Sequence, residues 1–140
     1  MRRLIILTIF FVFLLTSNQA FAQQEEEVAI LNNQIKAFND RDIDLLVENI
    51  DENFEWFFIT SDTMWVEVSG REQFRNGMES YFKSIPSVRS EISDLAIVGD
   101  RVSFKETVHW ENKKGKFSQA ALGVYQIKNN KILRAWYYAD

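Results

Sequence analysis

Apolar and polar residues alternate along most of the last third of the chain, residues 99–140. A period of two is typical of a β-strand that buries one face. The segments in this region are Arg101–Trp110, Phe117–Lys128 and Lys131–Ala139, and Glu91–Val98 precedes them as a further strand. Gly99-Asp100, the polar stretch 111–116 and Asn129-Asn130 separate them, and glycine and asparagine suit tight turns. The pattern therefore predicts four antiparallel strands in up-and-down order.

The preceding part of the chain combines helical periodicity with two shorter strand patterns. The expected elements are helices over Glu26–Asn39, Asp42 to Ile50 and about Gly70 to Ile85, and strands over Phe54–Thr60 and Met64–Val68. Asp42 is predicted to cap the second helix, and Ser69 with Glu72 forms a capping-box pattern at the third. Gly77 inside the third helix costs about 1 kcal/mol relative to Ala, which favours close packing there. Pro86 ends this helix.

The amino terminus has the pattern of a secretory signal peptide. Arg2 and Arg3 precede a nearly unbroken apolar run over residues 4–15, and Ala20-Phe21-Ala22 matches a cleavage site. A membrane anchor is the alternative, but the run is shorter than the roughly 20 apolar residues that span a bilayer. We therefore expect a signal peptide over residues 1–22, cleavage after Ala22, a periplasmic or extracellular location, and no membrane association of the mature protein.

Composition narrows the partners of the remaining domain, residues 23–140. Because the leader carries two arginines and no acidic residue, its removal would change the formal net charge from −4 to −6. An acidic domain lacks the basic patch that supplies most of the affinity for nucleic acid, so we expect no nucleic-acid partner. The chain has no cysteine, so a packed core must hold the fold without disulfides, and a hydrophobic content of 46% is sufficient for one.

Glu106 interrupts the apolar face of its predicted strand, between Phe104 and Val108. A carboxylate in apolar surroundings is desolvated, which raises its pKa. A raised pKa suits a general acid or base that works near neutral pH, so Glu106 is the candidate catalytic residue. Two structural roles remain open, a salt bridge to Arg134 or Arg71 and a strand-rim position in contact with water.

The order of the predicted elements and several short motifs resemble the nuclear transport factor 2-like superfamily and, within it, the SnoaL-like domains. The motifs are Ala37–Asp44, Gly70-Arg71-Glu72, Gly99-Asp100-Arg101-Val102 and Lys131-Ile132. The resemblance covers residues 29–140. It implies an α+β, cystatin-like cone in which three N-terminal helices pack on a strongly curved antiparallel sheet around an internal pocket. It also implies a homodimer formed through the convex sheet face.

Ketosteroid isomerase belongs to this superfamily, and an alignment shows whether this chain has that enzyme's catalytic groups at the matching positions. An alignment from Asn39-Asp40-Arg41-Asp42 places Phe58 where that enzyme has its general base. Its oxyanion hole uses a tyrosine and a protonated aspartate. Gln34 and Gly123 stand at the matching positions. All three groups are absent, so this reaction is not expected of the chain.

The same alignment sorts the aromatic residues by face. The residues expected to line the pocket are Gln34, Trp56, Phe58, Phe104, Val108, Tyr125 and Tyr137, with Glu106 among them. His109, Trp136 and Tyr138 alternate with the inward residues and are expected at the dimer interface. Ordinary core packing is the alternative interpretation for the inward aromatic residues.

The sequence contains no clear metal or cofactor signature. His109 is the only histidine and has no second ligand at metal spacing. Asp40, Asp42 and Asp44 suit turn and cap positions better than a calcium loop, which needs a longer ligand array with a glycine turn. Nucleophile, phosphate-loop and dinucleotide motifs are also missing. We therefore expect no cofactor and no metal.

Three functions remain open at this point. The first is an exported homodimer that binds an apolar small molecule in an aromatic pocket without catalysis. The second is a cofactor-independent isomerase, cyclase or dehydratase that uses Glu106 as acid or base. The third is an interaction module whose cone is filled by its own side chains.

Overall fold

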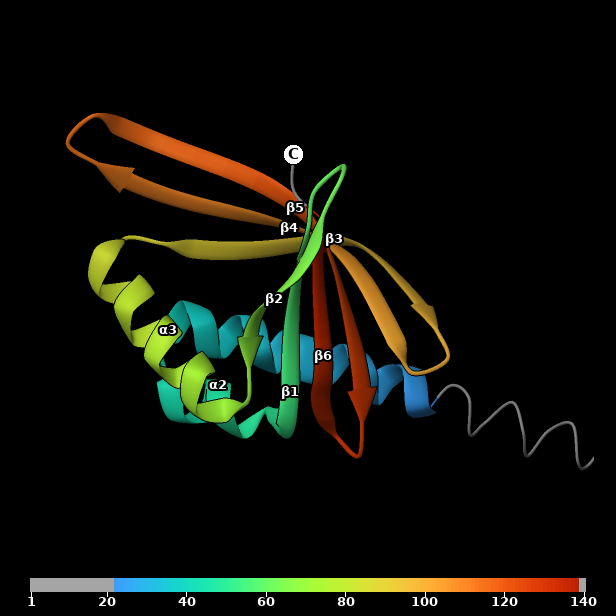
Figure 1. Ribbon diagram of the computed structural model, residues 1–140. Coiled ribbons are helices and arrows are strands. Elements are labelled where there is room, and N and C mark those ends of the chain that lie inside the picture. The colour runs from blue at the N-terminus through green and yellow to red at the C-terminus, as the bar shows by residue number, and fades with distance from the viewer. Residues whose placement is uncertain (1–21, 139–140) are drawn as a thin grey trace, which may run out of the picture.

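The computed structural model describes residues 22–138 (Figure 1). The first helix covers residues 22–40 of the described chain. The elements that follow are α2 (Ile43–Glu48), β1 (Ile50–Ile59), β2 (Met64–Ser69), α3 (Arg71–Ser84), β3 (Arg89–Val98), β4 (Arg101–Asn112), β5 (Gly115–Lys128) and β6 (Lys131–Tyr138). The order of helices and strands is the order predicted from the sequence.

One six-stranded sheet, in the order β2-β1-β6-β5-β4-β3, organises the molecule. Figure 1 shows the first helix, α2 and α3 on the same side of this strongly bent sheet, with the β4–β5 hairpin projecting past α3. The α+β cone with three helices is therefore confirmed.

The sheet is not antiparallel throughout, because β1 pairs with β6 in parallel. All other neighbouring strands are antiparallel. A parallel pair requires a long crossover, and the intervening chain through β2, α3 and the β3–β5 meander supplies it. Strand-by-strand patterns cannot show this, because they carry no information on which distant strands become neighbours.

The helix starts differ in how they are capped. The Asp42 side chain accepts a hydrogen bond from the Leu45 amide at 3.0 Å, so the predicted N-cap of α2 is confirmed. The predicted Ser69–Glu72 capping box is wrong, because Gly70, with φ of 80°, is the N-cap of α3 and no side chain caps it. Gln73 takes over part of this role, since its Oε1 accepts from the Ser69 amide at 2.8 Å.

Two further expectations are corrected. Helix α2 ends at Glu48, and Ile50 begins β1 as a wholly buried residue, four positions earlier than the predicted strand. Gly77 does not mark close packing, because a Cβ atom built there meets nothing within 4 Å. Gly77 instead borders a cavity in the cone.

Candidate ligand-binding site

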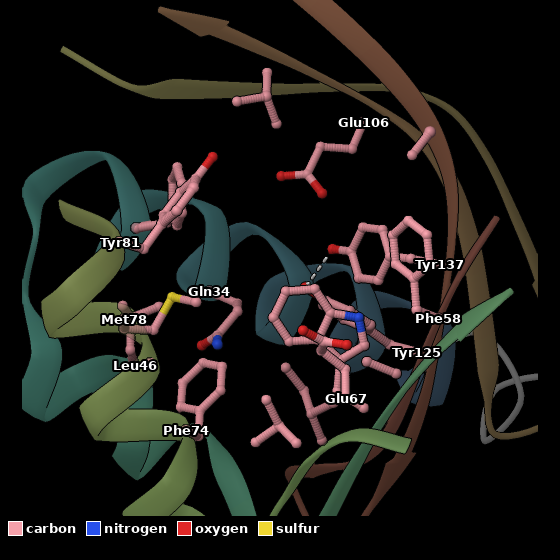
Figure 2. Close-up of a pocket in the computed structure, with 18 of the residues that line it drawn as sticks. Gln34, Leu46, Phe58, Glu67, Phe74, Met78, Tyr81, Glu106, Tyr125 and Tyr137 are labelled. Carbon is pink, nitrogen blue, oxygen red and sulfur yellow. Dashed lines mark hydrogen bonds between the residues drawn. The ribbon is translucent and has the colours of Figure 1, made fainter. Parts of the chain in front are cut away.

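A cavity of about 660 Å³ lies between the helices and the concave face of the sheet. This volume is within the range of small-molecule sites. Its walls come from all three helices and from β1, β2, β4, β5 and β6, and most of the lining is apolar. The polar side chains are few, and the largest group of them gathers around Glu106 (Figure 2).

Glu106 lies on the concave face of β4 and is 8% exposed. Its Oε1 accepts a hydrogen bond from the Ser90 hydroxyl. The two salt bridges considered from the sequence are absent, because Arg134 pairs with Glu55 and Arg71 donates to the Ile50 carbonyl. Burial raises the pKa of the Glu106 carboxyl, and hydrogen bonds from Ser90 and Tyr137 partly oppose that shift.

Ser90 was not identified from the sequence, and the local strand geometry explains why. Val98 pairs with Arg101 at the β3–β4 turn, and continuing that register would set Ser93 opposite Glu106. An irregularity between Ser93 and Ala96, where Asp94 has φ of 56°, shifts the register by one residue. The shift turns Ser90 onto the concave face, diagonally across from Glu106.

The position of Ser90 is fixed by the first helix. The Asn39 side chain donates to the Ser90 carbonyl and accepts from the Ser90 amide, both at 2.8 Å. Ser90 itself is 2% exposed. The hydroxyl that contacts Glu106 is therefore held by a contact between β3 and the carboxyl-terminal end of the first helix.

Two tyrosines extend the polar cluster across the sheet. The hydroxyls of Tyr125 on β5 and Tyr137 on β6 lie 3.0 Å apart, as the dashed line in Figure 2 marks. Burial raises the pKa of Tyr125, and the nearby Glu106 adds to the shift. Burial likewise raises the pKa of Tyr137 well above its ordinary value, again with a contribution from Glu106. Both tyrosines therefore remain neutral hydroxyl groups at physiological pH.

Tyr81 brings a third hydroxyl from the helical side. It lies on α3, and Figure 2 shows Tyr81 and Tyr137 on opposite sides of Glu106. Burial raises the pKa of Tyr81, and the proximity of Glu106 contributes to the increase. Helical periodicity placed Tyr81 on the buried face of α3, but it did not indicate that this face borders a cavity.

The other pocket residues named from the sequence lie around the same cavity, with one exception. Gln34, Trp56, Phe58, Val108, Tyr125 and Tyr137 line it together with Glu106. Gln34 is tied to Asn49, whose Nδ2 donates to the Gln34 Oε1 at 3.0 Å. The Nε1 of Trp56 is buried and has no hydrogen-bond partner.

Phe104 is the exception and does not line the cavity. It is 0% exposed and packs edge-on against Tyr125, with ring centroids 4.8 Å apart. Its partner across the β4–β5 ladder is Gly123, and a Cβ atom at that position would come within 2.5 Å of the Phe104 ring. The missing side chain lets the ring lie against the sheet, behind the cavity wall.

The residues predicted for a dimer interface lie on the convex face. Trp136 stacks on Phe57 with ring centroids 5.8 Å apart, and Tyr138 is 44% exposed. His109 is partly exposed, with its Nε2 at 3.6 Å from a carboxylate oxygen of Glu91. None of these three side chains lines the cavity in the cone.

Residues 22–138 contain no group of three or more His, Cys, Asp or Glu side chains that could hold a metal ion. In the same part of the chain, no helix combines the length and the hydropathy needed to cross a membrane. The predicted signal peptide lies outside the described residues, apart from Ala22.

The arrangement supports two kinds of chemistry. A buried carboxyl with a raised pKa is available as a hydrogen-bond donor when protonated, and as a proton acceptor when ionised. The neutral tyrosine hydroxyls beside it can orient a polar group of a ligand. The remaining walls are mostly apolar and favour apolar surfaces of a ligand.

Comparison with known proteins identifies relatives of this architecture. The family model described as "SnoaL-like domain" matches residues 31–135. No curated protein matches the chain.

Solved structures share the fold at low sequence identity. An uncharacterised cystatin-fold protein from Novosphingobium aromaticivorans has a TM-score of 0.68 at 22% identity, covering 79% of this chain and 96% of that one. A candidate polyketide cyclase from Bacillus cereus has a TM-score of 0.68 at 22% identity, covering 82% and 74%. An LEH-like epoxide hydrolase from M. tuberculosis has a TM-score of 0.67 at 14% identity, covering 83% and 84%. At such identities the likeness shows the fold alone.

Proposed function

The chain belongs to the SnoaL-like domain family, and from this premise we propose that it is an exported protein that binds an apolar small molecule in its cone. The cavity of about 660 Å³ between the helices and the sheet carries the proposal. A cone filled by its own side chains, as the interaction-module hypothesis requires, would leave no such space. Because the family and its fold host several unrelated activities, the argument rests on the site.

Isothermal titration of the protein that begins at Gln23 tests the proposal, with 2-ethylnaphthalene and 2-acetonaphthone as probes. We expect dissociation constants below about 100 µM for at least one neutral probe, because the walls are apolar. The proposal would be contradicted if neither probe gave binding heat in the titration or chemical-shift changes in NMR spectra of the protein.

Gly77 allows a matched control. Its Cβ position is open and borders the cavity, so Gly77→Phe should place a ring in the ligand space without a backbone clash. Asn76→Phe adds the same ring to the same helix at an exposed position that does not line the cavity. We expect the first variant to weaken probe binding at least several-fold and the second to leave it unchanged.

An enzyme remains the second candidate, favoured by the contact of Glu106 with hydroxyl groups in an apolar cavity. Its ionised carboxylate would remove a proton next to a ligand carbonyl and later return one. Hydrogen–deuterium exchange at the methyl group of 2-acetonaphthone in D₂O measures this step by NMR. Exchange faster than in buffer that is lost in Glu106→Gln would support catalysis, and equal rates would support binding alone.

Export and dimerisation complete the proposal. The leader pattern supports export, and mass spectrometry of the protein from a Sec-competent bacterial host should find an amino terminus at Gln23.

The apolar convex face supports a homodimer, since Leu122 is 50% and Tyr138 44% exposed. Analytical ultracentrifugation should show a dimer, and Leu122→Lys should dissociate it. A monomeric wild-type protein would contradict this part.

A further inference from the structure

The carboxyl groups that line the cavity have no positive side chain beside them. They belong to Glu106 and Glu67, and the described lining contains no lysine, arginine or histidine. Glu67 is exposed, whereas Glu106 is only 8% exposed. The cavity therefore has one acid in its interior, a second acid in contact with solvent, and no cation of its own.

The hydroxyl groups around Glu106 serve as hydrogen-bond donors. Ser90 donates to its Oε1, and Tyr137 also forms a hydrogen bond with the carboxyl. A tyrosine hydroxyl has one proton, so while Tyr137 donates to Glu106, Tyr125 has to be the donor in the 3.0 Å contact between the two tyrosines. All three protons then point along the network towards the carboxyl, and such donors stabilise its ionised form.

These donors are uncharged, so they leave the charge of an ionised Glu106 uncompensated. A buried charge without a partner of opposite sign is costly, and burial raises the pKa of this carboxyl for that reason. Figure 2 shows the Glu106 carboxyl facing the open space of the cavity, with Tyr81 and Tyr137 on opposite sides of it. Since the described lining holds no cation, a cation that relieves this cost has to come from a ligand.

The aromatic rings at this end of the cavity favour the same kind of ligand. Tyr81, Tyr125 and Tyr137 line the cavity, and so does the ring of Trp56, whose centroid is 5.4 Å from that of Tyr137. The faces of electron-rich rings attract cations, and this attraction is stronger where the cation has lost its water. A carboxylate among such rings is therefore a suitable partner for an ammonium group.

We propose, building on the binding function above, that the cavity takes an apolar amine whose ammonium group pairs with the ionised Glu106 carboxylate among the aromatic rings. The apolar body of the amine fills the space towards Leu46, Phe54 and Phe74, which line the same cavity. Contact with these apolar walls contributes affinity for any ligand of suitable shape. The ion pair selects the cation over neutral and anionic molecules of that shape.

Three naphthalenes with one substituent each test the inference: 2-naphthylmethylammonium, 2-ethylnaphthalene and 2-naphthoate. The first two have the same shape and differ in charge. Isothermal titration at about pH 8 compares them where ordinary carboxyl groups are ionised and an aliphatic amine keeps its charge. We expect the ammonium to bind about tenfold more tightly than the hydrocarbon, the effect of one charge-assisted hydrogen bond. The naphthoate should bind most weakly of the three.

Glu106→Gln keeps the shape of the side chain and removes its charge. In this variant the ratio of ammonium affinity to hydrocarbon affinity should fall about fivefold or more. Glu55→Gln makes the same change on the convex face, outside the cavity lining, and should leave the ratio unchanged. Both affinities come from the same preparation, so a partial loss of folded protein cancels from the ratio.

The outcomes separate this inference from the proposed function. Ammonium and hydrocarbon that bind the wild-type protein equally would overturn the inference and leave the proposed function intact. A preference for the ammonium that persists in Glu106→Gln would also overturn it, because other groups would then hold the cation. Failure of both neutral probes, the hydrocarbon and 2-acetonaphthone, would instead refute the proposed function. Ammonium binding that disappears in Glu106→Gln would in that case still support the cation site.

The groups that surround Glu106 allow an independent test by pH. Its titratable neighbours have raised pKa values and stay uncharged; they are Tyr137 from β6, Tyr125 from β5 and Tyr81 from α3. Strand β3 and the first helix contribute Ser90 and Gln34, which do not titrate in this range. Among the groups that face the proposed ammonium site, only Glu106 therefore changes its charge.

The ratio of ammonium affinity to hydrocarbon affinity should rise in the wild-type protein as the pH rises through the pKa of Glu106, and then level off. Glu67 is the other acid of the lining, and Glu67→Gln should show the same rise, since its amide oxygen can still accept from Trp65. A ratio that falls or stays flat between about pH 4 and about pH 8 would contradict an ion pair with Glu106.

Discussion

Two glutamates on opposite faces of the same sheet have different partners and different exposure. Glu55 lies on the convex face of β1, where its Oε2 is 3.1 Å from the Arg134 Nε and its side chain is 34% exposed. Glu106 lies on the concave face of β4, is 8% exposed, and has only hydroxyl groups as partners. The convex carboxyl is paired with a cation and partly exposed to solvent. The concave carboxyl has no cation beside it and is buried, and burial raises its pKa.

The two faces also differ in how tightly their side chains are packed. Phe104 is 0% exposed on the concave side, whereas the next residue along β4, Lys105, is exposed on the convex side. Stability should therefore depend on the concave positions and hardly on their convex neighbours. The following changes test this contrast, beginning with the largest expected effect.

Phe104→Ala should destabilise the protein most, by about 3–5 kcal/mol, because it removes a fully buried ring and leaves a cavity. Lys105→Ala, one residue away on the other face, should change stability by less than about 0.5 kcal/mol. Urea unfolding followed by tryptophan fluorescence measures both. Equal losses in the two variants would contradict the assignment of faces.

Gly123→Ala should destabilise by about 1–3 kcal/mol, because the new methyl group would overlap the Phe104 ring. Gly77→Ala is the matched change at a glycine with open space, and it should stabilise α3 by up to about 1 kcal/mol. Thermal unfolding of the two variants should move in opposite directions. A stabilising Gly123→Ala would show that the ring does not lie against the sheet.

Glu106→Gln should alter the pH dependence of stability. The folded protein holds the Glu106 proton more tightly than the unfolded chain, where the pKa is near its ordinary value of 4.5. Wild-type stability should therefore fall, relative to the variant, as the pH rises from about 4.5 to the folded pKa, and then level off. Between these two pKa values, the free energy of unfolding of the wild type falls by about 1.4 kcal/mol per pH unit relative to the variant.

The comparison with Glu106→Gln is necessary because Glu27 is also buried, at 2% exposure, and burial raises its pKa in the same direction. Only the difference in stability between the wild type and the variant isolates the contribution of Glu106 to the pH dependence. A difference that is constant from pH 4 to 8 would contradict an elevated Glu106 pKa.

The Glu55–Arg134 pair should have the smallest effect. The Arg134 and Glu55 side chains are 43% and 34% exposed, so solvent screens their attraction. A double-mutant cycle with Glu55→Ala and Arg134→Ala should give a coupling of about 0.2–1 kcal/mol that declines with added salt. A coupling above about 2 kcal/mol would contradict an ion pair that solvent screens.

The strand pattern predicted which face Glu106 takes, since alternation along β4 depends only on the local backbone. The helices, the hairpin turns and the Asp42 cap were also predicted from the sequence, because they depend on residues that are close along the chain. The parallel β1–β6 pair and the Ser90 contact could not be predicted in this way. The first depends on which distant strands become neighbours, and the second on a one-residue register shift near Asp94.

The packing around glycine residues could not be predicted from the sequence either. A glycine in a helix and a glycine in a strand look alike in the sequence, but Gly77 borders empty space and Gly123 faces a buried ring. The interpretation of Gly77 as a close contact was wrong because its neighbours in space come from other elements. Phe104 was likewise expected in the pocket wall, and only the missing side chain at Gly123 explains its place behind it.

The most direct test of the account is the pKa of Glu106, measured by ¹³C NMR titration of the protein that begins at Gln23, with and without 2-acetonaphthone. We expect the carboxyl to titrate above its ordinary value in the free protein, because burial raises its pKa, and to titrate at a different pH when the ketone fills the cavity. An ordinary pKa that the ketone leaves unchanged would contradict a buried Glu106 at the ligand site.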